Sequence, residues 1–166
     1  QVADILRRED EVREMARAFA DCHDFFFLGR GLDYAVAQEG ALKLKEISYR
    51  HSEALAAGEM KHGTLALVTE GVAAICIATQ ESLREKLASN IKEVKARDAT
   101  VLAIARAGDA EIQEYADYVF RVPDTLDELM PVLSIVPLQL LAYRIARGAG
   151  CEIDQPRNLA KSVTVE

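Results

Sequence analysis

Two short segments built almost entirely from apolar residues constrain the fold more than any other feature of the sequence. Residues 72–79 read VAAICIAT and residues 100–105 read TVLAIA, without alternation between polar and apolar positions. A strand that is apolar on both faces has to be covered on both faces, which is typical of a parallel sheet between two layers of helices. Shorter apolar segments at residues 25–29 and 118–122 predict two further strands.

Segments with helical spacing of apolar residues separate these strands. They lie at residues 2–21, 33–50, 81–99 and 127–148, whereas residues 51–67 are less regular and fit short helical turns. The alternation predicts an α/β domain, a three-layer α/β/α sandwich with a mainly parallel sheet. Ligands of such sheets bind at the carboxyl ends of strands, so the turn LGRGLD at residues 28–33 is a candidate position.

Composition excludes several classes of function. The net charge of −7 argues against a nucleic-acid-binding surface. The three cysteines are scattered, form no cluster with histidine at metal-ligand spacing, and suit a reducing, cytoplasmic compartment. We therefore expect no metal and no other cofactor. The charged first ten residues do not resemble a signal peptide, and the apolar residues 129–143 fit a buried helix better than a membrane span of roughly twenty residues.

The segment EGALKLKEIS at residues 39–48 carries regularly spaced charges on an otherwise apolar helix. At helical pitch, Glu39, Lys43, Glu46 and Arg50 fall within about 60° of one another and form a ridge of alternating sign. One interpretation is a solvated face on which Glu39 and Lys43 form an i, i+4 pair worth a few tenths of a kcal/mol. The other is a general base, Glu46, beside a cation, Lys43. Periodicity alone does not separate the two.

Longer motifs around this helix bear on that choice. FLGRGLDYAVAQEGALKLKE, then KLKEISYRHSEALAAGEMKHGTLAL, and finally DQPRNLAKSVTVE resemble the C-terminal sugar isomerase (SIS) subdomain of the glutamine–fructose-6-phosphate aminotransferase (isomerizing) family, the glucosamine-6-phosphate synthases. The resemblance extends over residues 25–166. It implies an SIS fold for residues 1–150, the second SIS subdomain of the isomerase part, followed by a C-terminal active-site loop at residues 151–166.

The resemblance also implies a reaction and the residues that perform it. The family converts fructose 6-phosphate and glutamine to glucosamine 6-phosphate and glutamate, which feeds the synthesis of UDP-N-acetylglucosamine and other amino sugars. By motif, Glu46 would move the proton between C1 and C2 of the sugar, and Lys43 would stabilise the enediol-like intermediate. Glu39 would support Lys43. Such a ketose/aldose isomerisation requires one carboxylate and one cation, and no metal.

Further roles are implied outside this helix. His62 would assist ring opening, reaching the site from the partner subunit of a homodimer. This chain has Thr64 where the family has a proline after the His-Gly pair, which is expected to loosen the turn. Lys161 would contact the sugar and form a Schiff base with its carbonyl, Ala160 would contact it through the backbone, and Arg157 would order the terminal loop. Without the resemblance, His62 reads as structural and Lys161 as a solvated lysine.

The same resemblance implies missing partners. The first SIS subdomain, which carries most of the phosphate-binding loops, and the glutaminase domain are expected to belong to the parent chain, so this chain should fold and self-associate but show little or no synthase activity. Two alternatives remain. One is a non-catalytic, sugar-phosphate-binding regulatory SIS module, although a sensor needs no base. The other is a response-regulator-like interaction domain, which is disfavoured because the first strand ends in Gly29-Arg30-Gly31 and not in an acidic cluster.

Overall fold

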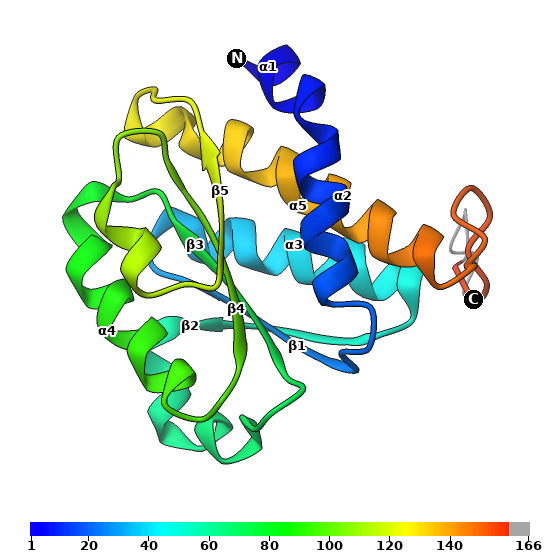
Figure 1. Cartoon of the computed structure of the whole chain (residues 1–166), viewed down its shortest axis with the longest axis horizontal. Coiled ribbons are helices and arrows are strands. Elements are labelled where there is room, and N and C mark those ends of the chain that lie inside the picture. The colour runs from blue at the N-terminus through cyan, green and yellow to red at the C-terminus, as the bar shows by residue number, and fades with distance from the viewer. Residues whose placement is uncertain (160–166) are drawn as a thin grey trace, which may run out of the picture.

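A five-stranded parallel sheet forms the centre of the computed structural model, which describes residues 1–159 (Figure 1). The strands follow the order β2-β1-β3-β4-β5, and every neighbouring pair is parallel. Their bounds are β1 (Asp24–Gly29), β2 (His51–Ala56), β3 (Ala73–Ala78), β4 (Thr100–Arg106) and β5 (Tyr118–Val122). The order reverses between β1 and β3, which makes the carboxyl ends of these two strands the switch point of the sheet.

Helices connect the strands and cover the sheet. The α-helices are α1 (Val2–Arg7), α2 (Glu9–Ala18), α3 (Leu32–Ser48), α4 (Arg84–Lys95) and α5 (Met130–Gly148). Short 3₁₀ helices are η1 (Ala57–His62), η2 (Thr64–Leu67), η3 (Glu81–Leu83), η4 (Glu111–Glu114) and η5 (Asp127–Leu129). Figure 1 shows α4 on one side of the sheet and α2, α3 and α5 on the other.

Two hydrophobic clusters, one on each face of the sheet, hold these layers together. Phe25 and Phe27 of β1 belong to the cluster that includes residues of α2, α3 and α5. Phe26 and Leu28, the alternate residues of the same strand, belong to the cluster with α4 and η1. Residues 25–29 of β1 are therefore buried on both faces, which explains why this part of the strand is apolar. The predicted three-layer α/β/α sandwich with a parallel sheet is confirmed.

Helix α5 belongs to the first cluster. The segment Asp127–Gly148 has the length and hydropathy of a membrane span, but half of its most apolar window is buried inside the domain. Leu138 and Leu141 are almost fully buried against the sheet and α3, as expected for a core helix. The approach to α3 is close, since a Cβ atom on Gly40 of α3 would lie 2.7 Å from Leu138 Cδ1.

Two predicted elements differ from the structure. Residues 51–56, interpreted as irregular, form the edge strand β2, whose only fully buried residue is Ser52. The helix predicted over residues 2–21 is two helices that meet at Arg8 and end at Ala18. The Arg8 side chain contacts β5. Its guanidinium lies 4.3 Å from the centre of the Phe120 ring and donates a hydrogen bond to the Arg121 carbonyl at 2.6 Å.

Candidate functional site

A tight turn and a buried carboxylate fix the start of α3, the helix that carries the predicted catalytic ridge. A Cβ atom on Gly29 would lie 2.3 Å from the Asp33 carbonyl oxygen, so only glycine fits between β1 and α3. The Asp33 carboxylate accepts hydrogen bonds from the Thr79 amide at 2.7 Å, the Thr79 hydroxyl at 2.5 Å and the Gln80 amide at 3.1 Å. It therefore ties α3 to the end of β3. Burial raises the pKa of Asp33 despite these hydrogen bonds.

The ridge itself is present on the outer face of α3. Lys43 Nζ lies 2.7 Å from Glu46 Oε2 and 3.7 Å from Glu39 Oε1. The side chains of Glu46 and Lys43 are 25% and 34% exposed, so both are half-buried and still reachable from solvent. The hydrogen bond that Lys43 donates to Glu46, with the nearby carboxylate charges, raises the pKa of Lys43. The structure thus brings Glu39, Lys43 and Glu46 together, with the lysine firmly protonated.

The fourth predicted member of the ridge was wrong. Helix α3 ends at Ser48, and Tyr49 adopts a left-handed conformation with φ of 60° that turns the chain away. Arg50 consequently points to the segment before β1, where its guanidinium donates to the carbonyls of Cys22 and, at 2.6 Å, Ala20. Its position on the helical wheel did not apply because the helix had already ended.

The segment after α5 folds back against the end of α3. The Arg157 amide donates to the Tyr49 hydroxyl at 2.8 Å, and the Arg157 guanidinium lies 4.2 Å from the centre of the Tyr49 ring. Tyr49 follows Glu46 by three residues, so residues 151–159 approach the ridge. Sequence reasoning missed Tyr49, for which an aromatic residue directly after the helix was the available signal. Ala160 and Lys161 lie outside the described residues.

His62 and the Glu39–Lys43–Glu46 ridge lie at opposite edges of the sheet. It ends η1, which follows the carboxyl end of β2, and its side chain is 64% exposed with Nε2 4.0 Å from Glu59 Oε2. Helix α3 runs back across the sheet, so Glu46 in its last turn lies near the amino ends of β1 and β2. Figure 1 shows the two edges on opposite sides of the molecule. Within one chain, the structure does not bring His62 to Glu46.

The turn that carries His62 contains the departure from the family motif. Gly63 has a φ of 151°, and Thr64 begins η2 directly after it. The expected loosening by Thr64 stays a prediction. The division of the chain at residue 150 also stays a prediction, although the described residues after it form no helix or strand.

The chemistry available at α3 is that of a carboxylate beside a protonated amine on a rigid element. Such a pair can accept a proton from carbon and hold the negative charge that develops next to it. Among residues 1–159, no group of three or more histidine, cysteine, aspartate or glutamate side chains is arranged to hold a metal ion.

Comparisons with known proteins identify the family of the chain. The family described as SIS domain matches residues 18–146. The chain is 58% identical, over 98% of its length, to the glutamine–fructose-6-phosphate aminotransferase [isomerizing] of Caldanaerobacter subterraneus subsp. tengcongensis, and 57% identical, over its whole length, to that of Methanosarcina acetivorans. It spans 27% of the length of each of these relatives.

A solved structure of a protein with a similar name also resembles this chain. The C-terminal domain of glucosamine-fructose-6-phosphate aminotransferase from Francisella tularensis superposes with a TM-score of 0.86 at 37% sequence identity. The match covers 93% of this chain and 43% of that one.

Proposed function

Because the chain belongs to the SIS domain family, we propose that it supplies the isomerase half of a glutamine–fructose-6-phosphate aminotransferase (isomerizing). The reaction is the conversion of fructose 6-phosphate and glutamine to glucosamine 6-phosphate and glutamate. Identities of 57% and 58% to relatives of that name support the proposal. In this proposal, a first SIS domain and a glutaminase domain of the parent protein complete the enzyme. They would supply most of the phosphate site and the ammonia.

The observation that carries the proposal is the 2.7 Å contact between Lys43 Nζ and Glu46 Oε2. Isomerisation of a ketose imine to an aldose amine moves one proton between adjacent carbons. Glu46 would take the proton from C1 and return it to C2 as a single carboxylate. Lys43, held protonated by that carboxylate, would stabilise the negative charge that develops on the sugar oxygen during the transfer.

The C-terminal segment would close this site over the sugar. The contact of Arg157 with Tyr49 supports the expected role of Arg157 in ordering the segment next to Glu46. We propose that Ala160, through its backbone, and Lys161, through its amine, contact the sugar from there. Once the ring is open, Lys161 would condense with the carbonyl of the open-chain sugar to form a Schiff base, with release of water.

His62 would act in a neighbouring copy of the chain. Its distance from Glu46 along the fold supports a homodimer in which His62 of each copy assists ring opening at the Glu46 of the other. A reducing, cytoplasmic location is part of the proposal. It is supported by Cys22, Cys76 and Cys151, which are all described and form no disulfide.

Replacement of Glu46 in the full-length protein tests the proposed base. We expect Glu46→Gln to abolish formation of glucosamine 6-phosphate while glutamine hydrolysis and binding of fructose 6-phosphate continue. Glu85→Gln, at an exposed position of α4, is the matched control and should leave both reactions unchanged. Unchanged isomerisation in Glu46→Gln would exclude Glu46 as the base and favour the regulatory, sugar-phosphate-binding alternative.

Activity of the 166-residue chain alone tests the need for the other domains. We expect little or no glucosamine 6-phosphate from fructose 6-phosphate and ammonia, because the turn at residues 28–33 offers no serine or threonine to a phosphate. Robust turnover would contradict this part of the proposal.

A further inference from the structure

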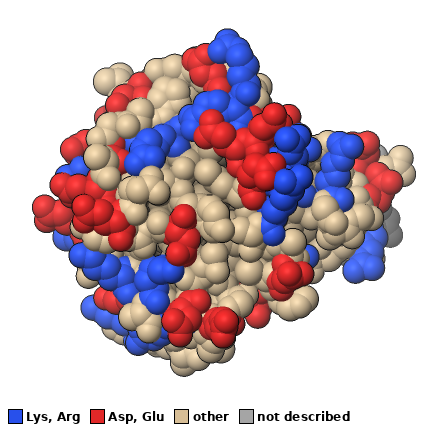
Figure 2. Space-filling model, viewed as in Figure 1, with Lys and Arg blue, Asp and Glu red and all other residues tan. Residues whose placement is uncertain are grey.

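A groove lined by five arginines separates α2 from the carboxyl-terminal half of α5. Its volume is about 430 Å³. The cationic lining consists of Arg13 and Arg17 of α2, Arg50 before β2, and Arg144 and Arg147 of α5. Among residues 1–159, Asp21 is the one acidic residue that lines it. In a chain with a net charge of −7, this concentration of positive charge is unexpected. Figure 2 shows basic side chains on both sides of the gap between the two helices.

Three of these arginines pair with carboxylates that lie outside the groove lining. Arg13 lies 2.9 Å from Asp10, Arg17 lies 2.6 Å from Glu14, and Arg144 lies 2.6 Å from Glu9. These pairs are between neighbouring turns or neighbouring helices, and each occupies only part of a guanidinium group.

The other two arginines have only neutral partners in the described part of the chain. Arg50 donates to backbone carbonyls, and Arg147 donates to the Tyr143 hydroxyl at 2.7 Å. The three paired carboxylates and Asp21 carry four negative charges, whereas the five arginines carry five positive charges. The groove is therefore not neutralised by its acidic neighbours.

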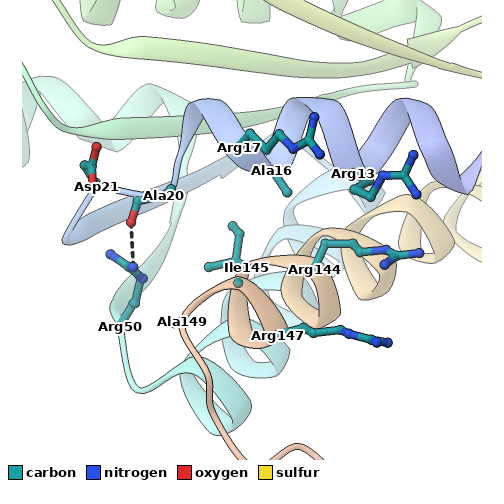
Figure 3. Close-up of a pocket in the computed structure, with 11 residues that line it drawn as sticks. Arg13, Ala16, Arg17, Ala20, Asp21, Arg50, Arg144, Ile145, Arg147 and Ala149 are labelled. Carbon is teal, nitrogen blue, oxygen red and sulfur yellow. Dashed lines mark hydrogen bonds between the residues drawn. The ribbon is translucent and has the colours of Figure 1, made fainter.

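Two of the five arginines also have hydrogen-bond donors without a partner. Within residues 1–159, the Nε atoms of Arg13 and Arg144 are buried and have no hydrogen-bond partner, although Arg13 Nε lies 3.8 Å from Glu14 Oε1. Figure 3 shows these two side chains extending in the same direction from facing helices. A buried donor without a partner costs free energy, so both arginines are held beside the groove at a cost to the fold.

We propose that this groove binds a ligand with phosphate groups. The guanidinium fork matches the oxygens of a phosphate, which can accept two parallel hydrogen bonds from each arginine. Ala16, Ala20, Ile145 and Ala149, which also line the groove, are small or apolar residues. The volume lies within the usual range of small-molecule sites. None of the lining residues belongs to the Glu39–Lys43–Glu46 ridge, so the groove is a second site beyond the proposed isomerase function.

Calorimetric titration of the chain with pyrophosphate, at constant ionic strength, tests the proposal. We expect saturable binding, weakened at least about tenfold in the double variant Arg17→Gln, Arg147→Gln. Both side chains are exposed and hold no buried group, so the variant should fold, which circular dichroism checks. Arg97→Gln, at the exposed end of α4 on the other face of the sheet, is the matched control and should bind as the wild type does.

Citrate at the same ionic strength distinguishes phosphate recognition from a general attraction to anions. We expect citrate to bind at least about tenfold more weakly than pyrophosphate, because its carboxylates are less densely charged. Equal binding of the two anions, no saturable binding of pyrophosphate, or equal affinity in the double variant and the wild type would each overturn the proposal.

Discussion

Lys43 is the residue whose proposed role is easiest to separate from a structural one. We expect Lys43→Gln in the full-length protein to lower kcat for glucosamine 6-phosphate by about 10²-fold, the usual effect of removing one group that stabilises a developing oxyanion. The contribution of its surface pair to stability should be within about 1 kcal/mol. Steady-state kinetics and urea unfolding measure the two effects.

Lys45 provides the control on the same helix. It is exposed and lies off the ridge, so Lys45→Gln should keep the wild-type kcat. Equal losses of activity in both variants would mean that positive charge on α3, and not the contact with Glu46, matters for the reaction.

Asp33 makes a pH-dependent contribution to stability whose sign follows from its burial. Its pKa is raised above the ordinary value of 3.8, so the folded chain binds the proton more tightly than the unfolded chain. The contribution is complete below 3.8 and is lost as the pH rises through the folded-state pKa. We therefore expect the difference in unfolding free energy, wild type minus Asp33→Asn, to decrease as the pH rises above about 4.

Urea unfolding of both proteins across this range measures that difference. The other carboxylates are common to the two proteins, so their titration cancels to first order. A difference that increases with pH would show that the hydrogen bonds from Thr79 and Gln80 outweigh burial, and that the folded-state pKa of Asp33 is lowered.

Local pattern predicted part of the residue-scale site. Glu39, Lys43 and Glu46 share a face because helical pitch alone places them there. Arg50 was assigned to the same face wrongly, since the pitch applies only until Tyr49 leaves the helix. The contact between Tyr49 and Arg157 could not be predicted from either segment, because 107 intervening residues have to fold first.

At the scale of elements, the contact between α3 and α5 depends on a missing side chain. A Cβ atom on Gly40 would lie 2.7 Å from Leu138 Cδ1 and 3.1 Å from the Phe27 ring. We expect Gly40→Ala to destabilise the domain by about 1–3 kcal/mol, the usual cost of overpacking a core. Gly148→Ala, near the end of α5, meets no atom within 4 Å and should change stability by less than about 1 kcal/mol.

Thermal or urea unfolding of the two alanine variants distinguishes packing from helix propensity. Alanine favours a helix at both positions, so a gain in stability at Gly40 would show that α5 moves away at little cost. In that case, the close approach of the two helices would not be needed for the fold.

The elements that could be predicted are those whose burial is visible in their composition. Strand β3 and residues 101–105 of β4 are buried on both faces and apolar, so their segments were identified directly. Strand β2 was missed because it lies at the edge of the sheet, where HSEALA has polar residues on its exposed positions. Its backbone pairing with β1 holds this segment as a strand, although its composition is not apolar.

At the scale of the whole molecule, the course of α3 decides which functions a single chain can perform. The helix begins beside Thr79 at the carboxyl edge of the sheet and ends near His51 at the amino edge. Glu46 and His62 therefore lie at opposite edges. Local sequence could not predict this separation, because it follows from strand order and helix direction together. The proposed reaction, which uses both residues, would therefore require a second copy of the chain.

Mixing two inactive full-length variants tests that requirement. If His62 acts across subunits, neither Glu46→Gln nor His62→Asn should be active alone, but a hybrid dimer has one site with both residues intact. Random exchange of subunits in an equal mixture should then restore about one quarter of the wild-type activity. A mixture of Glu46→Gln with Lys43→Gln is the control, because both changes affect the same ridge and no hybrid site regains all its residues. If His62 acted within its own chain, each hybrid site would lack one of the two residues, and the Glu46→Gln, His62→Asn mixture would remain as inactive as its components.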